Sequence, residues 1–487
     1  MESLGFHGQE FLYPPQSQSP SGLECQGCPI CGLGILRRSF SPFTGLQAAR
    51  SMDKSSSQRV VITGLGVVSP LGNDPDSLVQ SLHQGVSAIG PFTRVPQGVL
   101  SIDYGAEASC FSGDISDYGP MEKKLQRTIR KGSKVMCREI EMGVAVAQLA
   151  LNDAHLDAET RNRERTGVVY GCDYIMSLPE EFAVGIKKCL DDSGEFVFEE
   201  WGQTGKPEVN PLWLLKYLPN MPASHIAIYN DLRGPNNSIT VREASAGVAL
   251  SEAYSTLVRG HADVLIVGST GSRIHPLRTL HSSLQETLAS NQSDPATMSR
   301  PFVETRDGSV VGEGAAAMIC ETLEHAQGRG ANILGEVVGY GSSAVGQAQN
   351  GDFLKQAFVN VLRAALGDAD PNSIGHIHAH GLGTQECDRQ EAEAIRDVFG
   401  DPSGQPPVTT AKGHMGNLGA GGGMVESVAS LKSLGGDLFP IKNLTNLDPG
   451  CPINACHQPG ISAGDSFINV NITPQGQASA IRIQSFG

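Results

Sequence analysis

Positive charge is scarce in this sequence. Its 36 lysines and arginines are outnumbered by 51 aspartates and glutamates, which gives a formal net charge of −15 over 487 residues. This balance argues against nucleic acid or an anionic membrane surface as a partner, because both repel an acidic protein. An acidic protein partner remains compatible with the composition, since a local basic patch is enough to dock one.

Long apolar runs and paired cysteine spacings are also missing. No run approaches the roughly 20 apolar residues that a bilayer-spanning helix needs. The 11 cysteines are scattered, without the regular spacings of a small disulfide-bonded secreted protein. We therefore expect a soluble protein of the reducing cytoplasm, with no nucleic acid and no membrane among its partners.

The first 57 residues are set apart by their composition. Cys25, Cys28 and Cys31 form CxxCxxC, which resembles part of a bacterial iron–sulfur ligand run, but the fourth cysteine and the proline after it are missing. Leu33–Met52 contains three arginines and no acid, loosely like a transit peptide. Metal binding and targeting are two interpretations. The third, which we favour, is that residues 1–57 are a disordered or mis-called N-terminal extension and that Met52 is the true start.

The rest of the chain has the pattern of an α/β protein built from two successive halves. Short buried runs of branched side chains alternate with segments of helical periodicity, which indicates mainly parallel sheets covered by helices. The expected strands begin at Val60, Thr166, Ala262, Ile333 and His376, and the expected helices span Glu139–Ala154, Asp352–Leu366, Glu391–Phe399 and Val425–Leu434. We place an N-terminal half at residues 58–305 and a C-terminal half at residues 306–487.

Several separated motifs, spread from Gln58 to the C-terminus, carry a family resemblance. They are VVITGLGVVSPLG (Val60–Gly72), SRPFVETRDGSVVGEG (Ser299–Gly314), HAHGLGT (His378–Thr384) and TTAKGHMGNLGAGGGMVE (Thr409–Glu426). Together they resemble the β-ketoacyl-acyl-carrier-protein synthases of the thiolase superfamily. The resemblance implies a duplicated thiolase-type five-layer αβαβα fold, an acyl carrier protein as partner, and neither a cofactor nor a metal.

The stretch Gly234–Val264 has no cysteine, although it resembles the family's nucleophile turn. In the family a strand rises from a Gly-Pro, ends at a reactive cysteine and leads into a buried helix. Aligned without gaps, Gly234-Pro235 and Gly260–Asp263 both fall into register, and the nucleophile position is Glu243. A thiolate accepts an acyl group because it is nucleophilic and also a good leaving group. A carboxylate would form only a mixed anhydride, which water destroys, so the central reagent of a condensing enzyme is missing.

Other active-site positions of the family are retained or conservatively replaced. His380 resembles the first active-site histidine, which helps to stabilise the enolate and the oxyanion formed when a malonyl carrier loses carbon dioxide. Lys412 resembles the buried lysine and Glu426 its partner acid, a structural and electrostatic role because an unpaired buried ammonium is costly. Asn417 replaces the second histidine, and its amide could still hold a thioester carbonyl.

His380 also ends a run of alternate histidines with His376 and His378, followed by Asp388 and Glu391 at the family's spacing. Three such histidines could suggest a metal, but no matching carboxylate or cysteine cluster accompanies them. A further interpretation makes His380 a structural residue that caps the end of its strand.

The C-terminal loop departs from the family as well. Ile472–Gln477 (ITPQGQ) stands where the family has a Gly-Phe-Gly-Gly-Thr-Asn loop whose phenylalanine gates the acyl channel. Gly476 is retained, but the phenylalanine and its glycine neighbours are not. Pro474 fixes φ, so we expect a stiffer loop that no longer opens and closes around acyl chains.

Three other residues could be nucleophiles, each on weaker grounds. Ser245 reaches the nucleophile position only if a gap is accepted where none is needed. Cys172 has the pattern of a small buried hydrophobe. Cys387 lies next to Asp388, whose charge would raise the pKa of the thiol.

These departures favour one function and leave two alternatives. The favoured one is a non-condensing, chain-length-factor-like subunit that partners an active ketosynthase in fatty-acid or polyketide synthesis, because chain-length factors carry Gln at the position of Glu243 and resemble Val241–Gly247 and Asp388–Gly400. The alternatives are a malonyl-carrier decarboxylase and an ordinary 3-oxoacyl synthase. The partner is either a ketosynthase subunit or a second copy of this chain in a homodimer. A neutral Glu243 could mimic an acylated cysteine and favour decarboxylation, whereas an ionised one would repel the malonate carboxylate.

Overall fold

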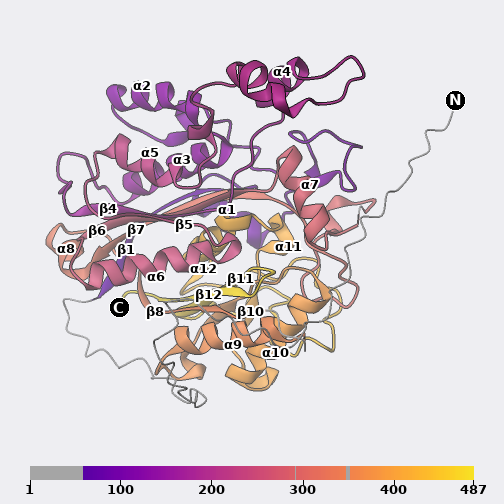
Figure 1. Cartoon of the computed structure of the whole chain (residues 1–487). Coiled ribbons are helices and arrows are strands. Elements are labelled where there is room, and N and C mark those ends of the chain that lie inside the picture. Colours follow the sequence, from indigo (N-terminus) through magenta and orange to yellow (C-terminus); the bar gives the residue numbers. More distant parts are fainter. Residues whose placement is uncertain (1–58, 291, 347–350) are drawn as a thin grey trace, which may run out of the picture. The chain divides into compact units, whose positions relative to one another are not determined.

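The computed structural model describes residues 59–290, 292–346 and 351–487, all of which belong to one structural unit, Lys54–Gly487 (Figure 1). The extension expected at residues 1–57, with its CxxCxxC cysteines, lies outside the described residues.

The first sheet is built from the first five long strands along the chain. They are β1 (Val60–Val68), β4 (Thr166–Cys172), β5 (Asn236–Ile239), β6 (Val264–Ser272) and β7 (Glu313–Thr322), in the spatial order β1-β7-β6-β4-β5. The pairs β1–β7 and β7–β6 are antiparallel, and the pairs β6–β4 and β4–β5 are parallel. Every residue of β1, β4 and β6 is buried, as expected for strands that are covered on both faces.

The second sheet repeats the first. It contains β8 (Gly335–Ala344), β9 (His376–His378), β10 (Val408–Thr409), β11 (Ser466–Ile472) and β12 (Gln477–Gln484), in the order β8-β12-β11-β9-β10. In both sheets the first strand along the chain is followed in space by the fifth, fourth, second and third, with the same pair directions. The first strands of the two sheets, β1 and β8, pair with each other at Val60–Ile62 and join the sheets. The fold is therefore an internal duplication.

Helices complete the five layers (Figure 1). The outer face of the first sheet is covered by α3 (Arg138–Asp153) and α5 (Met221–Asn230), and that of the second by α9 (Phe353–Leu366) and α10 (Gln385–Phe399). Between the sheets lie α6 (Ser245–Val258) and α12 (Gly422–Ser433), which contact strands of both. The five-layer α/β fold expected from the resemblance is confirmed.

The two middle helices are rich in small and apolar residues because they touch a sheet above and below. Every residue of α12 except Lys432 is buried. A Cβ atom added to Gly423 would lie 3.0 Å from Cβ of Ala246 in α6 and 2.8 Å from Nδ2 of Asn471, so only glycine permits this close approach. The tight packing fixes the starts of α6 and α12, which begin two residues after Glu243 and five residues after Asn417.

The remaining elements lie outside these layers or at their edges. They are α1 (Pro75–His83), α2 (Lys123–Gly132), α4 (Glu180–Lys188), α7 (Pro276–Gln285), α8 (Leu323–Gly328), α11 (Lys412–Met415) and a small hairpin of β2 (Ile89–Pro91) and β3 (Tyr104–Ala106). Within the described ranges, no helix is both long enough and apolar enough to cross a membrane.

The strand directions differ from the expectation. The sheets are mixed and not mainly parallel, because an apolar strand covered on both faces has the same pattern whichever way its neighbour runs. In addition, β7 completes the first sheet. We therefore propose a division between the halves after Thr322 and before Gly335, later than the division expected at residue 305.

Candidate active site

Glu243 lies at the buried turn between a strand and a middle helix. The backbone N–H of Gly234 donates to the carbonyl of Thr166 at 3.1 Å, which brings β5 alongside β4. After β5 a short 3-10 turn, Arg242–Ala244, carries Glu243 and leads into α6. Arg242 has a φ of 49°, an uncommon value for a residue with a side chain, so the turn is sharp and locally strained.

Glu243 belongs to an ion cluster of two arginines and two glutamates: Arg242, Glu243, Arg273 and Glu286. Arg273 donates to Oε1 of Glu243 and, through Nη1, to Oε2 of Glu286 at 2.7 Å. Arg242 contacts Glu286 and lies with Nε 3.5 Å from Oε2 of Glu243. The cluster is electrically balanced, which makes its burial tolerable.

The cluster keeps Glu243 ionised. Burial by itself raises the pKa of this carboxyl, but the charges of Arg273 and Arg242 act in the opposite direction and hold the pKa well below its usual range. The pKa of Glu286 is lowered in the same way, with Arg273 as the main opposing charge to its burial. At neutral pH the nucleophile position therefore holds a fixed carboxylate.

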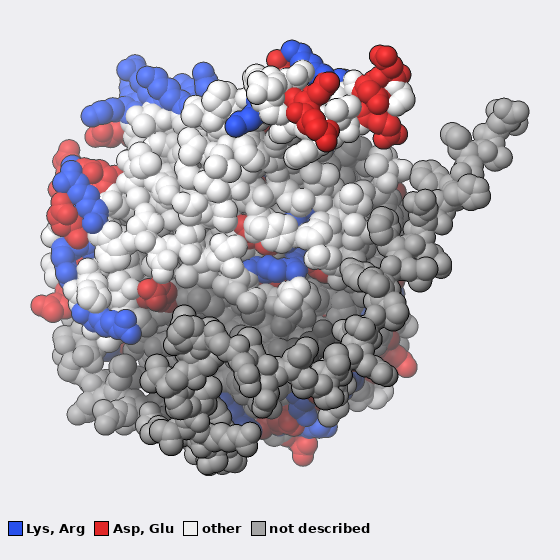
Figure 2. Space-filling view, viewed as in Figure 1, with Lys and Arg blue, Asp and Glu red and all other residues white. Residues whose placement is uncertain are grey.

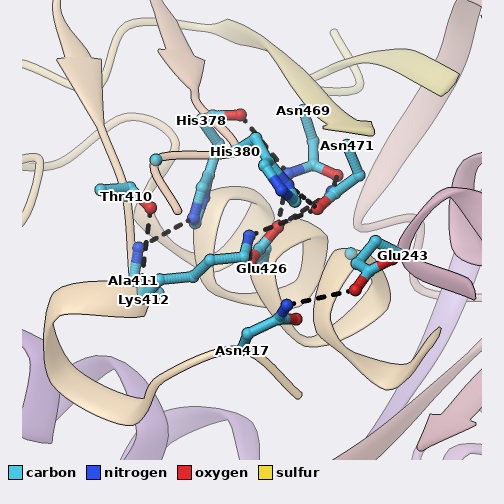
Figure 3. Close-up of polar contacts among 12 residues, drawn as sticks. Glu243, His378, His380, Thr410, Ala411, Lys412, Asn417, Glu426, Asn469 and Asn471 are labelled. Carbon is cyan, nitrogen blue, oxygen red and sulfur yellow. Dashed lines mark hydrogen bonds and ion pairs between the residues drawn. The ribbon is translucent and has the colours of Figure 1, made fainter. Parts of the chain in front are cut away.

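Asn417 completes the surroundings of Glu243. Its Nδ2 donates to Oε1 of Glu243 at 3.2 Å (Figure 3). Its Oδ1 accepts from the backbone N–H of Gly419 at 3.0 Å. Both polar ends of the amide are thus used inside the protein. Asn417 is not free to hold a thioester carbonyl unless it leaves Glu243.

A second polar group surrounds His380 (Figure 3). Its Nδ1 lies 3.0 Å from Oδ1 of Asn471. The Nδ2 of Asn471 donates to Oε2 of Glu426 at 3.0 Å, so Oδ1 is the accepting end and the proton of a neutral His380 sits on Nδ1. Burial and the charge of Lys412 lower the pKa of His380 to about 4. The imidazole is neutral and keeps a lone pair on Nε2.

Lys412 and Glu426 form a buried ion pair beside this histidine. Nζ of Lys412 lies 2.5 Å from Oε1 of Glu426 and also donates to Oδ1 of Asn471 at 3.3 Å. Burial raises the pKa of Glu426, but Lys412 outweighs this effect and keeps the carboxyl ionised. The pair links α11 to α12 across the start of the middle layer.

A pocket of about 330 Å³ opens beside His380. Its lining includes Glu286, Leu354, His380, Leu382, Thr384 and Pro474. Neither Glu243 nor Asn417 is among the described residues that line it. The pocket therefore reaches the ion cluster at Glu286, whose carboxylate binds Arg242 and Arg273, and does not reach Glu243.

The β11–β12 turn forms one wall of this pocket. The N–H of Gly476 donates to the carbonyl of Thr473 at 3.0 Å, and Gly476 takes a φ of 83°, which glycine adopts without strain. Pro474 lies within the turn, and Oε1 of Gln475 accepts from Nη1 of Arg242 at 3.5 Å. A four-residue hairpin turn occupies the place of the family's gating loop.

The other two histidines of β9 are used in a hydrogen-bond chain. The N–H of Ala411 donates to Nε2 of His378, so its proton lies on Nδ1, which donates to Oγ of Ser430 at 2.8 Å. Ser430 in turn lies 2.9 Å from Nε2 of His376, whose Nδ1 donates to the carbonyl of Ala463. Within the described ranges, no group of three His, Cys, Asp or Glu side chains is placed to hold a metal ion.

We predict that His376, His378 and His380 stay neutral at pH values well below the usual pKa of histidine. Burial lowers the pKa of His376 to about 4, of His378 to about 3 and of His380 to about 4. An unfolded chain takes up these protons near pH 6.5, so their contribution to stability decreases as the pH falls below that value. NMR of histidine-labelled protein, assigned with single His→Asn variants, should show no titration of the three rings above pH 5. A midpoint above pH 6 for any of them would contradict the structure.

The acids that follow His380 hold the backbone in place. Glu391 accepts from the N–H groups of His380 (2.6 Å) and Gly381 (2.8 Å). Asp388 accepts from the N–H groups of Phe302 and Gly383. Neither acid lines the pocket, within the part of the chain that the structure describes. Both therefore position the loop after β9.

The alternative nucleophiles are poorly placed. Oγ of Ser245 accepts from the N–H of Val241 and has no hydrogen bond to His380 among the described contacts. Cys172 and Cys387 are buried, and burial raises the pKa of both thiols well above its usual value. For Cys387 the neighbouring charge of Asp388 adds to the effect of burial, as the sequence predicted.

Four residues that matter to the site were not found from the sequence: Arg242, Arg273, Glu286 and Asn471. Arg273 follows β6 and Glu286 follows α7, and no sequence motif predicts that either residue lies close to Glu243. Asn471 had a weak signal, because Asn469 and Asn471 alternate along β11 and so face the same side of the sheet.

Comparisons with known proteins agree with this architecture. Residues 57–326 match the family model of the beta-ketoacyl synthase N-terminal domain, and residues 332–444 match that of the beta-ketoacyl synthase C-terminal domain. A curated relative, 3-oxoacyl-[acyl-carrier-protein] synthase 2 of Synechocystis sp., is 31% identical over 403 residues, which cover 82% of this chain and 90% of the relative. The break between the two matches falls between β7 and β8.

Two solved structures share the fold. The ishigamide ketosynthase/chain length factor superposes with a TM-score of 0.73 at 22% identity and covers 88% of this chain and 100% of its own. A type II PKS acyl-carrier protein in complex with its ketosynthase gives a TM-score of 0.74 at 21% identity, with the same coverage. Identities this low establish a common fold only, so the function has to be inferred from the residues of the site.

Proposed function

The chain belongs to the beta-ketoacyl synthase family, and from this premise we propose that it is a non-condensing, chain-length-factor-like subunit that partners an active ketosynthase in fatty-acid or polyketide synthesis. One observation carries the proposal: the nucleophile position holds an ionised carboxylate fixed between Arg242 and Arg273. A carboxylate in this position accepts no acyl group that survives water, so the chain needs a second subunit for carbon–carbon bond formation.

The access route supports the same proposal. In a condensing enzyme the acyl group must reach the nucleophile, but here the described residues that line the pocket include Glu286 and His380 and not Glu243. The hairpin turn with Pro474 and the contact between Arg242 and Gln475 restrict movement of the pocket wall. A subunit that does not turn over acyl chains has no need for a mobile gate.

Decarboxylation of a malonyl carrier is less well supported than it was by sequence. His380 lines the pocket, but its proton lies on Nδ1, so Nε2 carries a lone pair and cannot donate a hydrogen bond to a developing enolate oxygen. Asn417 is bound to Glu243 and is not available for that role. The described residues that line the pocket include Glu286, Asp307 and Glu386 and no lysine or arginine, so the lining repels a malonate carboxylate. We therefore propose the non-condensing subunit and not the decarboxylase.

A surface suited to a partner subunit lies at the end of the first sheet. The terminal strand β5 is paired on one side only, and no charged residue occurs from Gly234 to Val241. The neighbouring segment Tyr217–Asn230 also lacks charge, and Ile228 is 68% exposed. Figure 2 shows a broad, nearly uncharged surface over this region. Natural proteins protect free strand edges with charge, so an uncharged edge favours pairing with another chain.

The proposal predicts a chain that is inactive alone and stable in a heterodimer. Purified alone, and given acyl-carrier and malonyl-carrier, it should form no β-ketoacyl product and release no carbon dioxide. Co-expressed with a cysteine-containing ketosynthase of the same organism, it should elute as a one-to-one complex in size-exclusion chromatography with light scattering. A homodimer that ignores every such ketosynthase, or a β-ketoacyl product from the chain alone, would refute the proposal.

A further inference from the structure

Another pocket lies at the end of helix α3, away from the one beside His380. It has a volume of about 310 Å³, and among the described residues the two pockets have no lining residue in common. Its walls come from the start of α2, the last two turns of α3, the loop that follows α3, and Asn230 at the end of α5. These three helices gather on the outer face of the first sheet (Figure 1). A pocket of this size can hold a small organic molecule.

Three residues that line this pocket carry buried nitrogen atoms without a hydrogen-bond partner in the part of the chain that the structure describes. The atoms are Nε2 of Gln148, Nδ2 of Asn152 and Nε of Arg161. The side chains of Gln148 and Arg161 are almost fully buried, at 4% and 6% exposure. A buried donor without an acceptor is costly, because it has given up its hydrogen bond to water. All three groups are donors, so the partner they lack is a group with acceptor oxygens.

The guanidinium of Arg161 is held in place without an ion pair. Its Nη1 donates to the carbonyl of Leu156 at 3.4 Å and its Nη2 to that of Asn230 at 3.1 Å, and Nε is left over. Asp231 is close enough to act on this charge, but it forms an ion pair with Arg163 at 2.6 Å. Burial lowers the pKa of Arg161, and the charge of Arg163 adds to this effect. A negative charge in the pocket would therefore stabilise the buried cation.

The rest of the lining limits the size and charge of the ligand. The apolar part of the lining consists of Met121, Leu125, Leu151 and Leu156. The acids of the lining are Glu122, Asp157 and Glu159, and all three are exposed. These acids repel a doubly charged group such as phosphate more strongly than a singly charged carboxylate. The apolar side chains are suited to a short chain of CH₂ groups.

We propose that this pocket binds a small carboxylic acid, with its carboxylate at Gln148, Asn152 and Arg161 and a short apolar tail against the apolar part of the lining. An ionised carboxylate accepts about four hydrogen bonds, so one carboxylate can satisfy all three donors. The ligand would join the end of α3, the loop after it and the end of α5. The site uses no residue of the ion cluster or of the pocket beside His380, so the proposal does not depend on the proposed function.

Calorimetric titration of the full chain with sodium hexanoate tests the proposal. Hexanoate should bind in a saturable manner and at least about tenfold more tightly than each of three comparison compounds. Acetate lacks the tail, hexan-1-ol lacks the charge, and inorganic phosphate lacks the tail and carries more charge. Hexanoate should also raise the melting temperature of the protein, because it binds the folded state. Equally tight binding of phosphate or of hexan-1-ol would show a general anion site or a purely apolar site, and either result would overturn the proposal.

Two variants assign the binding to this pocket. Q148M replaces the amide by a thioether of similar size, and it should weaken hexanoate binding at least about threefold through the loss of one hydrogen bond. R161M removes the positive charge and should weaken binding at least about tenfold. Because R161M also loses the bonds to Leu156 and Asn230, its fold is checked by circular dichroism. If R161M does not fold, Q148M decides the outcome.

R482M is the matched control. Arg482 is also partly buried, donates from its Nη groups to the carbonyls of Leu366 and Val338, and has an unpartnered Nε within the described ranges, but it lines a different pocket. R482M should bind hexanoate as the wild type does. Equal weakening in R482M would show general destabilisation and would sink the proposal. If the wild type shows no saturable binding, or if Q148M and R161M bind hexanoate normally, the three donors are not a carboxylate site and the proposal fails.

Discussion

Replacing Arg273 by methionine should lower the free energy of unfolding by about 3–5 kcal/mol, the usual cost of leaving a buried charge without its partner. Arg273 has no exposed side-chain surface and contacts both carboxylates of the ion cluster. Without it, Arg242 alone faces Glu243 and Glu286. Urea unfolding followed by circular dichroism measures the change.

A second substitution separates charge imbalance from lost packing. The double variant R273M/E243L removes one charge of each sign and leaves Arg242 paired with Glu286. It should regain most of the stability lost in R273M, because no buried charge then lacks a partner. R163M, at the exposed pair with Asp231, is the surface control and should change stability little. If the double variant were less stable than R273M, the cluster would not be held together by charge balance.

The position of Glu243 could be predicted from the sequence, but the ion cluster around it could not. The gap-free register from Gly234 to Asp263 was sufficient to place Glu243 at the buried turn before α6. Its protonation state depended on Arg273 and Glu286, which lie 30 and 43 positions further along the chain and come from the ends of other elements. Charge partners of this kind follow from three-dimensional packing, and no local pattern encodes them.

The fold could be predicted to a similar degree. Strands β1, β4 and β6 and helices α3 and α9 were expected within a few residues, because buried branched runs and helical periodicity are strong local signals. Helix α10 begins at Gln385, six residues before the expected start at Glu391, since its first turns are polar and lack an apolar period. Strand direction was not predicted, because a fully buried apolar run has the same sequence pattern in parallel and in antiparallel pairs.

The second large effect is expected at the buried pair beside His380. Replacing Lys412 by methionine leaves Glu426 with only the amide groups of Asn469 and Asn471, at 3.2 and 3.0 Å. Both members of the pair are almost completely buried. We expect the free energy of unfolding to fall by about 3–5 kcal/mol in urea titrations, as for other broken buried pairs.

The histidine provides a readout that general destabilisation would not change. The charge of Lys412 is one of the factors, after burial, that lower the pKa of His380. In K412M the pKa of His380 should therefore rise relative to the wild type, as measured by NMR of the labelled ring. In K412M/E426Q both buried charges are gone, so most of the lost stability should return. The ammonium group at position 412 is still absent and contributes nothing to the electric field at His380. If K412M destabilised the protein without raising that pKa, Lys412 would hold α11 to α12 without setting the charge state of the histidine.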